Sequence, residues 1–308
     1  MAATGADTRR RSSAALAAVA TLVSWLAVAL VAARPDSPLT PPLPPGGEAP
    51  GFLAGPAATL GLDLLPKDVA ALVALGALIA AAAAFLYSLR EAWRGRISVS
   101  TALAVGIALH ALAVALPLFL SRDVYSYSLY GRMVSVHGTN PYVSVPLDFS
   151  GDPFFPYVSR DWLDISSVYG PAFVALSAAV TRVVRTPAAA IDAFQLLAGL
   201  ASIATMFVVA RAARRVLPER ASFAVLLLGW NPVVVLHGVA GGHSDALVGL
   251  AVAVAALLLL RGRPVAATAV MALGTLVKVS GAVPLLVLVA GAVLARPRAE
   301  RLRALAVH

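Results

Sequence analysis

Long apolar segments alternate with short polar ones along the whole chain. Most of the apolar segments have about 20 residues, which is the length that an α-helix needs to cross a hydrocarbon core of about 30 Å. The clear segments are 14–33, 68–89, 99–120, 188–210, 221–239, 246–260 and 264–295. Only the last is too long for one crossing, and Lys278, Ser280 and Gly281 near its middle predict two short helices joined by a turn. We therefore predict an all-α polytopic membrane protein with about eight transmembrane helices, plus juxtamembrane helices in a large outer loop.

The composition agrees with lipid as the solvent of most of the chain. Hydrophobic residues make up 60% of the 308 positions and charged residues 13%, about half the charged fraction of a soluble domain. The net charge of +9 comes from arginine clusters between apolar segments, so we expect no nucleic-acid partner. The chain contains no cysteine, which excludes disulfides and thiolate metal sites. Segment 14–33 is longer than the apolar core of a signal peptide, so we expect it to be an uncleaved span.

Segment 168–184 decides the orientation of everything after it. Its 17 residues would span roughly 25 Å as a helix, which is short for a crossing. If it lies at the outer surface, sixteen of the 24 lysines and arginines are cytoplasmic and eleven of the 15 acidic residues are outside. If it crosses, only nine basic residues remain inside. The excess of basic residues in cytoplasmic loops therefore favours a juxtamembrane or re-entrant helix.

This orientation divides the chain into six parts. They are a cytoplasmic N-terminus with the first span (1–33), a proline-rich outer loop (34–67), two spans (68–120), an outer catalytic loop (121–187), the remaining spans (188–295) and a basic cytoplasmic tail (296–308). Six prolines between positions 35 and 45 predict an extended, solvated tether at the start of loop 34–67, in preference to a recognition surface.

The outer loop 121–166 combines carboxylates with aromatic residues. Its aspartates are Asp123, Asp148, Asp152, Asp161 and Asp164, and they alternate with tyrosines and Trp162. Tyrosines at the headgroup level either form an aromatic belt or hold sugar rings, and the sequence leaves both readings open. Gly138, Asn140 and Pro141 predict a turn that ends a helix beginning near Asp123.

Two aspartates stand at outer ends of spans. Asp123 and Asp245 each either cap a helix or act as a general base beside a substrate. Arg122 and Arg132 either hold a phosphate or are solvated. Lys278 either extends to the membrane surface or pairs with a carboxylate or phosphate.

The histidines offer one further kind of site. His110 inside segment 99–120 is expected to form a hydrogen bond between helices. His237, His243 and Asp245 could bind a divalent metal, although the spacing leaves both the ion and its ligands unknown.

An ordered set of motifs resembles a known enzyme family. The set comprises an acid opening the first large outer loop (Asp123), Asn-Pro-Tyr (140–142), Tyr-Gly-Pro (169–171), His-Ser-Asp (243–245) and Val-Lys (277–278) before a second apolar helix. It is similar to the actinobacterial polyprenol-phosphate-mannose-dependent α-1,6-mannosyltransferases of the glycosyltransferase C superfamily, which build lipomannan and lipoarabinomannan. The likeness covers about residues 99–290.

The resemblance implies a function, a site and partners. The enzyme would move mannose from a polyprenyl-phosphate carrier to a mannan or glycolipid acceptor at the extracytoplasmic face of the cell membrane, with inversion. Asp123 would match the catalytic acidic residue of the family and serve as the base. From its place at the outer end of a span, we expect Asp245 to be a second catalytic residue that orients or assists. The expected binding residues are Arg122, Tyr127, Arg132, Asn140, Tyr142, Tyr169, His243 and Lys278. Members of the family carry several more spans after the Lys278 region, so we expect this chain to be truncated. The alternative is a transporter or lipid-linked glycan flippase without transferase chemistry.

Overall fold

The computed structural model describes residues 2–47 and 52–294, and these residues form helices joined by turns and loops. The longer helices are α1 (Ala2–Ala32), α3 (Lys67–Trp93), α4 (Val99–Val114), α5 (Asp123–Ser135), α6 (Pro171–Val183), α7 (Pro187–Val216), α8 (Ala221–Gly229), α9 (Asp245–Leu259), α10 (Pro264–Val277) and α11 (Ala282–Leu294). Short elements are α2 (Ala54–Thr59), the 3₁₀ turns η1 (Leu62–Leu64), η2 (Pro146–Phe149), η3 (Phe155–Tyr157), η4 (Arg160–Trp162), η5 (Pro218–Arg220) and η7 (Val279–Gly281), and the π-helix η6 (Val233–Ala240).

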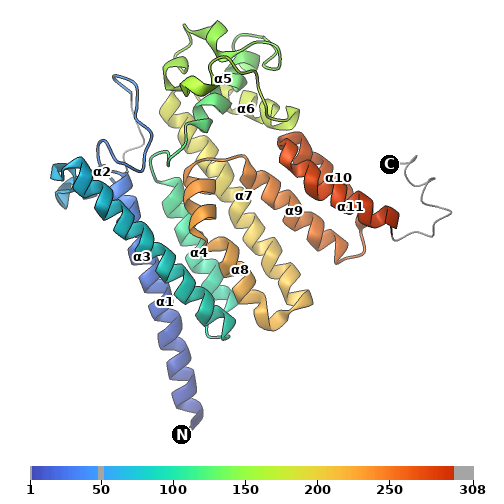
Figure 1. Cartoon of the computed structure of the whole chain (residues 1–308). Coiled ribbons are helices and arrows are strands. Elements are labelled where there is room, and N and C mark those ends of the chain that lie inside the picture. The colour runs from blue at the N-terminus through green and yellow to red at the C-terminus, as the bar shows by residue number, and fades with distance from the viewer. Residues whose placement is uncertain (1, 48–51, 295–308) are drawn as a thin grey trace.

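The long helices form a bundle that α5 and α6 cap at one end (Figure 1). Helix α1 packs along α3, α4 packs against α7 and α8, and α9 packs against α7 and α10. Buried polar contacts join the centre of this bundle. The indole of Trp230 donates to the Ala102 carbonyl at 2.8 Å, and His110 on α4 bonds to the Ser202 hydroxyl on α7 at 2.6 Å. The prediction of an interhelical His110 is therefore confirmed.

The prediction of an all-α membrane protein is confirmed, but the prediction of eight spans is not. Among the described residues, three helices are long and apolar enough to cross a membrane: α3, α7 and the Ser12–Ala32 part of α1. A fourth span is possible only if η5–α8 and η6, which bend by 46°, cross together. The physical reason is that breaks shorten the other apolar segments. Helix α4 ends at Val114, for example, and α9 has 15 residues.

The break predicted near Lys278 is present. Helix α10 ends at Val277, Lys278 has an extended backbone with φ −153°, and α11 begins at Ala282 after a single 3₁₀ turn. In segment 168–184 the helix α6 has 13 residues and is about 20 Å long, which is less than the hydrocarbon core. It packs against α5, where Gly131 allows the backbone of Ser177 to approach closely. The side of the membrane on which α6 lies stays a prediction.

The proline-rich segment is not a solvated tether in its first part. Leu39 is buried, and its carbonyl accepts a hydrogen bond from the Leu120 amide at 3.0 Å. The guanidinium of Arg122 donates to the Pro42 carbonyl. The prediction was wrong because proline content indicates an extended backbone and does not exclude packing by the residues between the prolines. The segment instead covers the strand-like connection between α4 and α5.

Candidate functional site

Asp123 lies among side chains that can bind its carboxylate. It is the first residue of α5. The hydroxyl of Tyr127 donates to Oδ2 of Asp123 at 3.5 Å, and Nδ1 of His243 lies 3.5 Å from the same oxygen. Tyr127 packs edge-to-face on Tyr169 with ring centroids 4.8 Å apart. Burial raises the pKa of Tyr127 well above its ordinary value, so its hydroxyl stays a neutral donor.

A tight glycine turn carries His243 to Asp123. Gly242 has φ +63°, and a side chain on Gly241 would meet the His237 carbonyl at 2.3 Å and the His243 ring at 2.7 Å. The rings of His237 and His243 stack with centroids 4.2 Å apart. Burial and the neighbouring His237 hold the pKa of His243 below its ordinary value, against the opposite influence of Asp123 and Asp245. The imidazole is therefore neutral near pH 7.

Asp245 and Lys278 form an ion pair in the lining of a pocket. The Lys278 Nζ lies 2.6 Å from Oδ2 of Asp245. The pocket, which we call the Asp245 pocket, has a volume of about 610 Å³. Its polar lining includes Asp123, His243, Asp245 and Lys278. The remaining lining residues are Ser121, Ser202, Thr205, Leu228, Val233, Val234, His237, Gly238, Ala246 and Gly249.

A second hollow meets the first at Asp123. This hollow, the Trp162 groove, has a volume of about 490 Å³ and is lined by Arg122, Trp162 and part of the proline-rich segment, including Pro41. Ser121 and Asp123 line both the groove and the Asp245 pocket. The carboxylate of Asp123 thus stands where two binding spaces join, one largely apolar and one polar and aromatic.

Three of the predicted motifs are joined behind this junction. The Tyr142 hydroxyl donates to the Tyr169 carbonyl at 2.9 Å, and the Tyr142 amide donates to the Asn140 side chain at 3.0 Å. The Gly170 amide donates to the Val277 carbonyl at 3.0 Å, where a side chain on Gly170 would meet the Leu276 carbonyl at 2.1 Å. Asn140 and Tyr142 line neither hollow, and their expected role in binding stays a prediction.

The two predicted arginines differ. Arg122 lines the Trp162 groove beside Asp123. Arg132 instead donates from Nε to both carboxylate oxygens of Asp152 at 2.9 Å, stacks over the Phe154 ring and lines neither hollow. The expected contact of Arg132 with a lipid head is therefore not supported, because its guanidinium is already paired with a buried carboxylate.

The Asp152 cluster is a structural anchor of the outer loop. Burial by itself would raise the pKa of Asp152, but hydrogen bonds from the Phe154 amide, His137 and Arg132 outweigh it and hold that pKa below its ordinary value. His137 Nε2 lies 2.8 Å from the carboxylate. The cluster ties residues 152–154 to the end of α5.

Sequence reasoning missed Gln195 on α7. Its side-chain amide is buried and donates to the Leu116 carbonyl at 3.1 Å and to the Ala240 carbonyl at 2.7 Å. The Phe119 amide also donates to the Ala240 carbonyl, at 3.1 Å. These bonds fix the end of α4 against the end of η6, and so set the approach of Asp123 to the His243 turn. The available signal was a lone amide side chain inside an apolar helix, which needs partners.

Leu120 has a strained backbone in the connection between α4 and α5. It has φ +58°, and the next amide, of Ser121, donates back to the Phe119 carbonyl at 2.7 Å. A left-handed backbone at a residue other than glycine costs about 1–3 kcal/mol and persists only where the surroundings hold it. Here the hydrogen bonds to Leu39 and Ala240 hold the turn, which delivers Asp123 to the junction of the two hollows.

A metal centre is not supported by the described geometry. Residues 2–47 and 52–294 contain no group of three histidine, aspartate or glutamate side chains arranged to hold an ion. The rings of His237 and His243 are in contact at an interplanar angle of 37°. We therefore assign these residues no role that depends on a metal.

Comparison with known proteins decides the family. A family model described as "Alpha-(1->6)-mannopyranosyltransferase, N-terminal domain" matches residues 53–295. This chain belongs to that family. The matched range contains every residue of the Asp245 pocket, and the resemblance drawn from the ordered motifs is confirmed.

One curated relative shows how similar the sequence of this chain is to that of a named mannopyranosyltransferase. Alpha-(1->6)-mannopyranosyltransferase A of Corynebacterium glutamicum is 30% identical over 167 residues, which is 54% of this chain. The aligned part spans about a third of that relative, 34% of its length. No solved structure matches the chain.

Proposed function

We propose that this protein is a membrane mannosyltransferase that transfers mannose from a polyprenyl-phosphate carrier to a mannan or glycolipid acceptor. The observation that carries the proposal is that Asp123 lines two hollows at once. A transferase must bring a donor and an acceptor to one base, whereas a binding protein needs only one site. Family membership supports the choice of mannose and of an α-1,6 linkage.

The Asp245 pocket fits the carrier. A polyprenyl phosphate has an anionic head and a long apolar tail, and this pocket is lined both by ionised groups and by apolar side chains. Lys278 supplies a point charge for the phosphate while remaining paired with Asp245 at 2.6 Å. The transporter alternative would need a path of polar groups through the bundle, whereas this pocket also has an apolar part, which includes Leu228 and Val234.

The Trp162 groove fits the acceptor. It places an indole and the Arg122 guanidinium beside Asp123 at the end of the bundle that α5 and α6 cap. Arg122 is held there by its hydrogen bond to the Pro42 carbonyl, so the proline-rich segment forms one wall of the acceptor site. An aromatic face with polar neighbours is suited to a sugar ring, which has both apolar and hydroxyl faces.

In the proposed reaction Asp123 acts as general base. An acceptor hydroxyl attacks the anomeric carbon of mannose, and its proton passes to the Asp123 carboxylate as the new bond forms. The bond from the anomeric carbon to the phosphate oxygen breaks, and the electron pair leaves with the carrier phosphate, which Lys278 stabilises. Attack opposite the leaving group inverts the anomeric configuration. His243 and Tyr127 orient the carboxylate through contacts of 3.5 Å.

The proposal is tested on membranes that contain the full chain. Radiolabelled polyprenyl-phosphate mannose and a short mannoside acceptor should give a labelled, longer mannoside whose new linkage is cleaved by an α-1,6-specific mannosidase. Nucleotide-linked mannose at the same concentration should give none, once carrier synthesis is blocked. Equal transfer from the nucleotide donor would show that the carrier assignment is wrong.

A further inference from the structure

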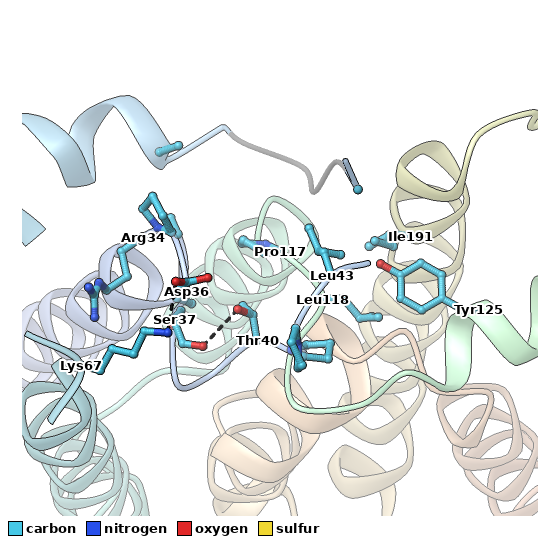
Figure 2. A pocket seen from close by; sticks show the side chains of 17 residues that line it. Arg34, Asp36, Ser37, Thr40, Leu43, Lys67, Pro117, Leu118, Tyr125 and Ile191 are labelled. Carbon is cyan, nitrogen blue, oxygen red and sulfur yellow. Dashed lines mark hydrogen bonds and ion pairs between the residues drawn. The ribbon is translucent and has the colours of Figure 1, made fainter. Parts of the chain in front are cut away.

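A third hollow lies away from the Asp245 pocket, and the two share no lining residue. We call it the Arg34 pocket. It has a volume of about 540 Å³ and lies between the proline-rich segment, the ends of α1 and α3, and Tyr125 of α5. Figure 2 shows Arg34 and Lys67 on one side of this pocket and Tyr125 on the other, with its hydroxyl directed into the hollow.

Arg34 is a buried cation that lacks an anionic partner. Its residue is 7% exposed, and Nη2 donates to the Leu65 carbonyl at 2.9 Å. Its Nε and Nη1 are buried and have no hydrogen-bond partner, and no carboxylate of the described chain lies within 4.0 Å of the guanidinium. Burial of an uncompensated guanidinium is strongly unfavourable, so the position calls for an anion.

Tyr125 presents a second unpaired donor to the same hollow. It is 1% exposed, and its hydroxyl has no partner among the described residues. Burial raises its pKa well above the ordinary value, so the hydroxyl keeps its proton. At the rim Lys67 pairs with Asp36 at 3.2 Å, and both side chains are largely exposed. The pocket therefore carries a net positive charge and unpaired donors.

We propose that the Arg34 pocket binds a phosphate group. A phosphate offers several oxygen acceptors and no obligatory donor, which matches a guanidinium fork, a phenol and a lysine. The shared chemistry is the phosphate, carried by a lipid headgroup or free in solution. Arg34 contributes the ion pair, Tyr125 a hydrogen bond from the opposite wall and Lys67 a charge at the rim.

The position of the Arg34 pocket suggests which substrate carries the phosphate. Thr40, Pro41 and Pro42 line both this pocket and the Trp162 groove, and that groove continues to Asp123. A phosphate-anchored glycolipid held at Arg34 would therefore have its glycan directed along the groove to the base. This assignment to the acceptor rests on the proposed function, whereas phosphate binding itself does not.

The test measures binding to the full chain in a neutral detergent. The midpoint of thermal unfolding is followed while phosphatidylglycerol, diacylglycerol or inorganic phosphate is added. Phosphatidylglycerol should raise the midpoint of the wild type, and diacylglycerol, which lacks the phosphate, should not. A response to phosphatidylglycerol alone identifies a lipid headgroup, and an equal response to inorganic phosphate identifies the free group as sufficient.

Matched variants make the test specific to the pocket. Arg34→Gln should weaken the apparent affinity about tenfold or more, and Tyr125→Phe should weaken it several-fold. Arg160→Gln removes an exposed arginine of the other outer loop, 121–166, and should respond as the wild type does. An undiminished response in Arg34→Gln overturns the proposal, as does a wild-type response to diacylglycerol that equals the response to phosphatidylglycerol.

Two features of the design allow each result of the binding test to be interpreted. If Arg34→Gln does not fold, Tyr125→Phe, which removes one buried oxygen, decides the matter, and an undiminished response there overturns the proposal. No sugar transfer is measured, so failure of this binding test leaves the proposed function standing. Binding by a protein that proves inactive in the transfer assay would count against the proposed function alone.

Discussion

Oδ2 of Asp123 and Nδ1 of His243 lie 3.5 Å apart, although one residue begins α5 and the other lies in the turn before α9. Burial keeps the pKa of His243 low, so a neutral imidazole faces the carboxylate near pH 7. A neutral ring can donate one hydrogen bond to the carboxylate and orient it without adding a positive charge that would weaken its basicity. The arrangement suits an aspartate that must accept a proton.

Asp123→Asn should abolish most of the transfer while preserving the fold. The amide keeps the size of the side chain and can still contact Tyr127 and His243, but it has no basic oxygen. We expect kcat to fall roughly 10²–10⁴-fold. Asp164→Asn, an exposed aspartate of the same loop, serves as the control and should remain active. Near-normal turnover of Asp123→Asn at equal membrane abundance would show that the base is another residue.

Lys278→Gln should affect the carrier more than the acceptor. The ammonium lines the Asp245 pocket, and the loss of a hydrogen bond to a charged group costs about 1.5–3 kcal/mol, equivalent to roughly tenfold or more in affinity. We expect KM for the carrier to rise by that factor and KM for the acceptor to change little. Equal changes in both KM values would instead indicate a structural role for the pair with Asp245.

Gly249→Leu should block the carrier tail without disturbing the helix. Gly249 lines the Asp245 pocket, and a Cβ atom built on it meets no atom within 4 Å, so the backbone there has room for a side chain. The backbone of α9 should accept the change, because leucine favours helix over glycine by roughly 0.5–1 kcal/mol. We expect transfer to be lost at unchanged abundance.

Gly76→Leu on α3 is the matched control for that block. A side chain built there also meets no atom within 4 Å, and Gly76 lines none of the three hollows described above. The control should retain activity. Full activity of Gly249→Leu would show that the carrier tail lies elsewhere.

The sequence predicted elements and motifs better than it predicted contacts. Apolar length indicated helices, and Lys278 inside an apolar segment indicated a break, because both signals are local. Asp123 meets His243 because Gln195 bonds to the carbonyl groups of Leu116 and Ala240, which lie far apart in the sequence. No local sequence pattern predicts these bonds. The number of spans was overestimated because apolar composition does not show where a helix ends, as at Val114.

The absence of a local signal for contacts also explains why the sequence did not separate the roles of Arg122 and Arg132. Arg122 directly precedes Asp123 and Arg132 follows it on the same predicted helix, and the sequence offered the same two roles for both. Helix α5 turns them to different neighbours, so one lines the Trp162 groove and the other meets Asp152. The partner of Arg132 could not be chosen beforehand, because loop 121–166 offers five aspartates with similar local surroundings.

Asp152→Asn should destabilise the protein in a pH-dependent way. The folded state holds the pKa of Asp152 below its ordinary value of 3.8, so its stabilising contribution is present above about pH 4. That contribution is lost as the pH falls through the lower pKa of the folded state. We expect the variant to lose roughly 2–4 kcal/mol near pH 7, because Arg132 is left without its carboxylate.

The check is the difference in unfolding midpoint between the wild type and Asp152→Asn, measured from pH 7 down to pH 3. This difference should be large at pH 7 and should shrink below about pH 4. Asp164→Asn again provides the control, because its carboxylate is exposed. A difference that does not change over this range would mean that packing, and not charge, explains the loss.

The orientation of the outer loop can be tested directly because the chain has no cysteine. Ser150 lies in loop 121–166 and Glu219 lies between α7 and α8, and both are exposed, whereas Ser244 is buried and unsuitable for labelling. If segment 168–184 does not cross, α7 is the one crossing between Ser150 and Glu219, and the two positions face opposite sides.

In intact cells a membrane-impermeant thiol reagent should then label Ser150→Cys and leave Glu219→Cys unlabelled. In permeabilised cells both variants should react, which controls for accessibility. Reaction at both positions in intact cells would place them on one side, so segment 168–184 would have to cross, against its short helix α6 and against the distribution of basic residues.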